Sequence, residues 1–247
     1  MGENLTRRSL SILAVTLVAC AASTALGQGF WEKKDFEKWS QGECQKLLSD
    51  SPWAKSYTLS RVLVQTLQEQ AAVPGRATNP QITYLIQFWS ARPIRQALIQ
   101  QGRVSEAAAR MSEEQKAALK QREARFLAND FADLILVDLT YSTNTQGLEQ
   151  ELNHYWDSRT QEEIKQFTYI VAGGHRINPK QVNISKSGRR DIQLLFPRQV
   201  DGQALVTPQD KRISVEFEAP PIGIFAGQRI LIEFYLTKMS VDGKPAY

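Results

Sequence analysis

The stretch FADLILVDLTYS, from Phe131 to Ser142, decides the fold that the sequence predicts. Apolar residues occupy both alternating positions of this segment, and the acidic residues Asp133 and Asp138 interrupt them. Successive side chains of a strand point to opposite faces, so a run of this kind is typical of a strand buried on both faces. The segment therefore predicts a strand at the centre of a sheet.

Further strands are predicted on both sides of this segment. Upstream, we expect Tyr57–Leu67 and residues 81–91 to pair as a hairpin around the loop AAVPGRATNP. The spacing of Leu63 and Leu67 is also compatible with a helix, so a helix remains the alternative for Tyr57–Leu67. The downstream strands share alternating apolar residues between turn residues, and they are Phe167–Ala172, Gln181–Ser185, Asp191–Phe196, Lys211–Glu218, Arg229–Leu236 and a closing hairpin at Val241–Ala246 with an Asp242-Gly243 turn.

The helices are predicted mainly in the first two thirds of the chain. Two of them begin with capping boxes, in which two side chains reciprocally satisfy backbone N–H groups. The predicted helices start at Ser40 with Glu43, run from Pro93 to Gln101, start at Ser112 with Gln115, and cover residues 145–158. The expected fold class is α+β, a mainly antiparallel β-sheet with several helices, in a single domain over residues 28–247.

Residues 1–27 are typical of an export leader. Arg7 and Arg8 precede an apolar run from Leu10 to Ala22, and the small residues ALG at 25–27 suit cleavage. The paired arginines also fit a twin-arginine signal. The tetrapeptide LVAC resembles a lipobox, which would place a lipid on Cys20 instead. We expect an exported protein, periplasmic or secreted, whose membrane contact is limited to the leader or a lipid anchor.

The charge of the chain is weakly positive. The formal net charge is +4, and the leader holds two arginines and one glutamate, so residues 28–247 carry 28 basic and 25 acidic residues. These charges are spread along the chain, which does not predict nucleic-acid binding. The sequence contains no phosphate-binding glycine loop, serine-nucleophile elbow or calcium loop. With two histidines and few cysteines, no metal and no cofactor are predicted.

Cys44 is the cysteine that would remain after removal of the leader, and it has two interpretations. A helix start beside it, with His154 or His175 as a base, would suit a thiol nucleophile. The second cysteine and the aromatic residue that follow the cysteine of thiol proteases are missing. Cys44 also shares a helix face with Leu47 and Leu48. We therefore predict a buried, unreactive thiol.

Two short polar groups supply the candidate binding residues. In QFWSARPIRQ, Trp89, Arg92 and Arg95 stand where a strand passes into a helix, and the arginines either bind an anionic group or form internal ion pairs. In VAGGHRINP, the two glycines before His175 and Arg176 either let backbone amides approach an anion or form a turn. The expected partner is an unknown protein or a small anionic ligand, and no residue is assigned a catalytic role.

Four motifs together resemble a known group of proteins. They are SPWA at 51–54, WSARPIRQA at 89–97, FPR at 196–198 and KMSVDGK at 238–244. In this combination the chain looks like uncharacterised exported proteins of soil bacteria, acidobacteria in particular. The resemblance covers nearly the whole mature chain. It implies export and one domain, but no activity and no catalytic residues.

The sequence favours a non-catalytic binding module or a module associated with the cell envelope. Two other classes stay open. A cofactor-free hydrolase could use scattered carboxylates or His175, although nothing in the sequence selects a pair of acidic residues. A lipid-anchored envelope assembly factor would follow from lipidation of Cys20.

Overall fold

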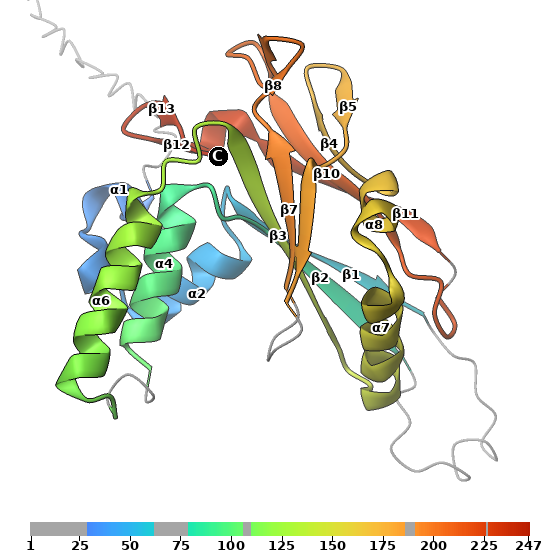
Figure 1. Cartoon of the computed structure of the whole chain (residues 1–247), viewed down its shortest axis with the longest axis horizontal. Coiled ribbons are helices and arrows are strands. Elements are labelled where there is room, and N and C mark those ends of the chain that lie inside the picture. The colour runs from blue at the N-terminus through green and yellow to red at the C-terminus, as the bar shows by residue number, and fades with distance from the viewer. Residues whose placement is uncertain (1–28, 62–78, 106–109, 186–190, 226) are drawn as a thin grey trace, which may run out of the picture.

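The computed structural model describes residues 29–61, 79–105, 110–185, 191–225 and 227–247 (Figure 1). The predicted leader with Cys20 and the second half of the predicted strand Tyr57–Leu67 lie outside these residues. Among the residues described, no helix is both long enough and apolar enough to cross a membrane.

The chain has an α+β fold, which confirms the fold class predicted from the sequence. The helical segments are α1 (Phe30–Lys33), η1 (Phe36–Lys38), α2 (Gln41–Ser49), α4 (Arg92–Arg103), α6 (Glu113–Ala128), α7 (Gln146–Ser158), α8 (Gln161–Gln166) and η2 (Leu236–Lys238). The strands are β1 (Ala54–Ser60), β2 (Gln81–Phe88), β3 (Leu134–Thr143), β4 (Thr168–Ala172), β5 (His175–Ile177), β6 (Gln181–Ile184), β7 (Asp191–Pro197), β8 (Gln199–Val200), β9 (Gln203–Ala204), β10 (Arg212–Ala219), β11 (Gln228–Tyr235), β12 (Ser240–Val241) and β13 (Lys244–Pro245).

β3 is the middle strand of an antiparallel five-stranded sheet with the order β1-β2-β3-β7-β6. Its residues from Ile135 to Thr140 are all buried, including Asp138. The prediction of a central strand from the segment 131–142 is therefore confirmed. The predicted pairing upstream of it is confirmed for the described residues, because β1 and β2 pair in antiparallel register from Ala54 to Ser60. The first strand begins three residues before the predicted Tyr57, and residues 62–67 of the prediction lie outside the described residues.

A second antiparallel sheet, with the order β11-β10-β4-β5, packs against one face of the first. Tyr84 of β2 meets Phe217 of β10 at a ring distance of 5.1 Å, and Phe88 of β2 meets Phe234 of β11 at 4.8 Å. All four side chains are at most 1% exposed. The buried residues of both sheets join those of α2, α4 and α7 in one continuous hydrophobic core.

The helices lie in two places around the sheets. α1, α2, α4 and α6 gather on the left of Figure 1, and α7 and α8 lie on the right. α7 buries Leu148, Leu152 and Trp156 on one face. α6 is exposed over most of its surface, with only Glu123 buried. The short segments α1, η1 and α8 were not predicted, since they are too short to show a period.

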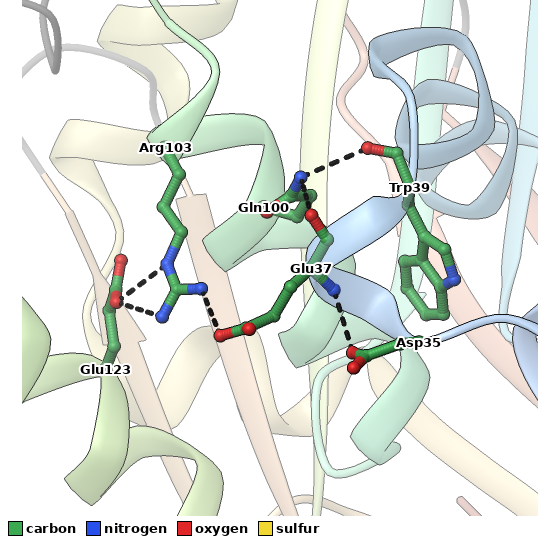
Figure 2. A network of polar contacts seen from close by, with 6 residues as sticks. All are labelled: Asp35, Glu37, Trp39, Gln100, Arg103 and Glu123. Carbon is green, nitrogen blue, oxygen red and sulfur yellow. Dashed lines mark hydrogen bonds and ion pairs between the residues drawn. The ribbon is translucent and has the colours of Figure 1, made fainter.

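A polar network joins the N-terminal segment to α4 and α6 (Figure 2). Gln100 of α4 donates to the backbone oxygens of Glu37 and Trp39, at 2.9 and 3.1 Å. Arg103 donates to Glu123 of α6 at 2.8 and 3.0 Å and to Glu37 at 2.8 Å. All of these contacts satisfy groups within the chain, so the network fixes the helices in place.

The capping box predicted at the start of α2 is confirmed, and it makes stability depend on pH. The Glu43 carboxylate accepts from Lys34 Nζ and from the backbone N–H of Ser40, both at 2.7 Å. These contacts, that of Lys34 first, lower the pKa of Glu43 from 4.5 to about 2. A carboxyl group whose pKa is lower in the folded state stabilises the fold above its unfolded pKa, and this contribution is lost as the pH falls toward 2.

We expect Glu43→Gln to lower the free energy of unfolding by about 1 kcal/mol at neutral pH, because the side chain is partly exposed and solvent screens the interaction. The deficit should shrink as the pH falls from about 6 to about 3, because the unfolded wild-type chain takes up a proton at Glu43 in this range while the folded chain, with its lower pKa, stays mostly ionised. Urea unfolding at several pH values measures both effects. Glu114→Gln, at an exposed position in the first turn of α6, is the control. A deficit that does not change with pH would contradict this assignment.

Candidate functional site

The outer face of the four-stranded sheet carries the candidate site. Cross-strand register places Tyr169 of β4, Glu216 of β10 and Leu231 of β11 in one row across this face. Arg176 of β5 belongs to the neighbouring row on one side of this row, two residues further along the strands. Arg229 of β11 belongs to the neighbouring row on the other side. Arg229 is therefore a diagonal neighbour of Glu216 on the adjacent strand, within reach of a long side chain. Arg176 lies two strands from Glu216, is a diagonal neighbour of Tyr169, and reaches Glu216 across β4.

Both arginines bind the carboxylate of Glu216. Arg176 donates from Nη2 at 2.7 Å and from Nε at 3.2 Å, and Arg229 Nε lies 2.8 Å from the same carboxylate. The Glu216 side chain is 9% exposed, whereas those of Arg176 and Arg229 are 40% and 71% exposed. The hydrogen bond to Glu216 raises the pKa of Arg176 above its usual value. A buried anion thus holds two cations at the surface.

Arg176 is oriented by an aromatic ring and by a tight turn. Its guanidinium carbon lies 3.3 Å from the centre of the Tyr169 ring, a cation–π contact. The turn before it has Gly173 at φ +56° and Gly174 at φ +80°, a backbone that glycine adopts without strain. The glycine pair in VAGGHRINP is therefore a hairpin turn between β4 and β5. His175 is exposed at the start of β5.

The arginines border a surface pocket. Its volume is about 490 Å³, and its lining comprises Gln166, Phe167, Tyr169, Arg176, Glu216, Phe217, Glu218 and Arg229. Phe167 and Glu218 also line an adjoining notch of about 10 Å³, which includes Trp156, Arg159 and Thr168. Leu231 and Tyr235, 51% and 46% exposed, show that this side of the sheet is open to solvent. The site is therefore accessible from outside.

One residue that lines the notch, Trp156, carries a buried donor that lacks an acceptor among the described residues. The Trp156 side chain is 4% exposed, and its indole Nε1–H has no hydrogen-bond partner in the part of the chain that the structure describes. A buried N–H without an acceptor costs about 1–3 kcal/mol, so such groups usually meet a water molecule or a ligand. The volume of the notch is close to what one water molecule occupies.

The candidate residues of the motif QFWSARPIRQ lie away from this pocket, and the buried one, Arg95, stabilises the fold. Arg95 of α4 is 3% exposed and donates to the backbone oxygens of Ser90, Phe126 and Asn129. Its hydrogen bonds thus go to peptide oxygens rather than to an external anion, and those to Phe126 and Asn129 lie at the end of α6, where carbonyl groups lack helical partners. Burial, together with the nearby charge of Arg92, lowers the pKa of Arg95.

Trp89 and Arg92, the other two candidate residues of this motif, lie close to Arg95 in the chain. Trp89 donates from Nε1 to Gln87 at 3.0 Å, and its ring lies 6.3 Å from that of Phe126. Arg92 is exposed. Figure 1 shows α4 and β5 on opposite sides of the molecule, so the structure does not bring these residues together with His175 and Arg176.

Cys44 is a core residue. Its side chain is fully buried on the same face of α2 as Leu47 and Leu48, as predicted. Burial and the neighbouring charge of Glu43 raise the pKa of its thiol, which disfavours the thiolate that a nucleophile needs. His154 is exposed on α7. Within the described segments, no group of three or more His, Cys, Asp or Glu side chains is arranged to hold a metal ion.

The sequence indicated only one of the central residues of the site, Arg176. Glu216 and Arg229 fall in predicted strands, and alternation alone places Glu216 on the solvent side of its strand. What alternation does not give is the order of the strands or their register. These two features bring Arg176, Glu216 and Arg229 together from three different strands.

Comparison with protein-family models, with curated proteins and with solved structures finds no match for this chain. The resemblance to exported proteins of soil bacteria therefore stays a prediction, and the site itself is the basis for a functional proposal.

Proposed function

We propose that the protein is an exported, non-catalytic binding module that holds a small ligand through a carboxylate at Arg176 and Arg229. Export follows from the leader-like residues 1–27 and places the protein in the periplasm or outside the cell, with lipidation of Cys20 as the route to an envelope-associated form. The observation that supports binding is the convergence of two arginines on one buried carboxylate at the edge of a pocket.

The free donors of the arginines are what a ligand would use. A guanidinium has five N–H donors in a planar fork that matches a carboxylate. Glu216 takes Nε and Nη2 of Arg176 and Nε of Arg229, so that, as far as the described residues go, the other Nη groups can serve a second acceptor. Because Glu216 and Tyr169 already fix the side chains, little conformational entropy is lost when a ligand binds.

Loss of either arginine should weaken binding of a carboxylate. We expect Arg176→Gln and Arg229→Gln each to reduce the affinity about tenfold, the effect of one charge-assisted hydrogen bond. The measurement is an NMR titration of the arginine Nε–H signals of the purified protein with succinate and with N-acetyl amino acids, up to about 10 mM.

The matched control is Arg212→Gln. Arg212 lies on the same sheet face but pairs with Glu233 at 2.7 Å and does not line the pocket. Its substitution should leave the affinity unchanged. The proposal fails if no carboxylate shifts the signals of Arg176 and Arg229, or if Arg212→Gln weakens binding as much as the other two substitutions.

A further inference from the structure

Glu218 is a charged pocket residue that the proposed carboxylate contact does not use. It stands directly opposite Arg229 in the register of β10 and β11. Arg229 nevertheless binds Glu216, and the side chain of Glu218 has no hydrogen bond or ion pair to any described residue. Glu218 is exposed and lines both the pocket and the notch. The pocket therefore offers a free acceptor beside its free donors.

This arrangement selects against a purely anionic ligand. Arg176 and Arg229 together carry two positive charges, and Glu216 and Glu218 carry two negative ones, so the pocket as a whole is close to neutral. A second carboxylate at the arginines would sit near Glu218 and be repelled by it. A ligand that also carries an ammonium group replaces this repulsion with an attraction and gives Glu218 a partner.

The register limits the distance between the two charges of such a ligand. Residues that are directly opposite in an antiparallel pair have Cβ atoms about 4.5–5.5 Å apart. Glu218 and Arg229 form such a pair, so the side chains proposed to hold the ammonium group and the carboxylate start from neighbouring positions on the sheet, and a small ligand can reach both. An α-amino acid, in which one carbon separates the two charged groups, is a compact ligand of this kind.

Phe167 supplies a wall for the rest of the ligand. Its ring is 49% exposed, and it lines the pocket and the notch together with Glu218. An aromatic face attracts an ammonium group and packs against an apolar side chain. The pocket volume of about 490 Å³ is within the range of small-molecule sites.

We infer that the ligand of this site is a free amino acid or a similarly small zwitterion, bound through its carboxylate at Arg176 and Arg229 and through its ammonium group at Glu218. The inference rests on the proposed function and specifies its ligand class. Trp156 provides a reporter, because it lines the notch together with Phe167 and Glu218 and its indole N–H has no partner among the described residues.

The test compares three forms of each compound in a panel of amino acids. The free amino acid carries both charges, the N-acetyl derivative carries only the carboxylate, and the amide carries only the ammonium group. Affinities are measured by calorimetry and by the shift of the Trp156 indole N–H signal, which is assigned with Trp156→Phe. We expect at least one free amino acid to bind about fivefold more tightly than both of its derivatives, the effect of one exposed ion pair.

Three variants show which residue causes the preference for the free amino acid. Glu218→Gln should abolish the preference for the free amino acid over its N-acetyl derivative and should not weaken binding of the derivative. Glu233→Gln is the control, because Glu233 pairs with Arg212 outside the pocket. Arg229→Gln should weaken both compounds.

The outcomes separate this inference from the proposed function. If N-acetyl derivatives bind as tightly as every free amino acid in the panel, or if Glu218→Gln keeps the preference, the zwitterion inference is wrong and carboxylate binding stands. If neither form of any compound shifts the signals of Arg176 and Arg229, both proposals are wrong.

Discussion

Arg95→Met is expected to lower the free energy of unfolding by about 3 kcal/mol and to loosen the end of α6. Arg95 Nη1 donates to the backbone oxygen of Phe126 at 2.7 Å and also to that of Asn129. The guanidinium lies between the rings of Phe126 and Phe131, 5.9 and 5.0 Å from their centres. Methionine fills the space but donates no hydrogen bond, so the carbonyl oxygens at the end of the helix lose their partner.

Urea unfolding measures the loss of stability, and hydrogen exchange of the last turn of α6 locates it. Arg92→Met is the matched control, because Arg92 is exposed on the same helix and its loss should cost less than about 0.5 kcal/mol. Equal effects of the two substitutions would show that Arg95 does not hold α6.

Phe88→Ala should cost about 4 kcal/mol, the largest loss that we expect from a single core substitution. Phe88 is fully buried in β2 and meets Phe234 of β11, so it joins the two sheets. Removal of the ring takes away its burial and leaves a cavity between the two sheets. The cavity can close up only in part, because β2 is held by β1 on one side and β3 on the other. The chemical denaturation midpoint and the near-ultraviolet circular dichroism of the aromatic residues measure the effect.

The same substitution at an exposed phenylalanine, Phe167→Ala, should cost less than about 1 kcal/mol and is the control. If Phe88→Ala does not fold, Phe88→Leu provides the measurement, with an expected loss of about 1.5 kcal/mol. A loss below about 1 kcal/mol for Phe88→Ala would mean that the sheets are not held together at this contact.

Local sequence signals gave most of the secondary structure, because each depends on residues close together in the chain. The apolar segment 131–142 identified β3, the capping residues Ser40 and Ser112 marked the starts of α2 and α6, and the Asp242-Gly243 pair marked the turn between β12 and β13. At that turn both residues have positive φ, +50° and +72°, as expected for this pair. The strand that was predicted for residues 81–91 ends at Phe88, because a turn leads from there into α4.

Arg95 and Arg176 show that local sequence signals do not predict the partner of a side chain. Both were candidate ligand contacts, since an arginine near a glycine pair or a helix start looks the same whether its partner is inside or outside the protein. The partners of Arg95 at the end of α6 are peptide oxygens more than 30 residues away, and Arg176 meets a carboxylate 40 residues away. No short window of sequence contains these pairs.

The amino-acid sequence by itself determined the central strand, the α+β class and the buried position of Cys44, because alternation and helix spacing act over a few residues. The tertiary structure alone decided that the two sheets pack face to face and that Arg176, Glu216, Glu218 and Arg229 share one pocket. Strand order and register come from the packing of the whole core, and they determine which side chains become neighbours.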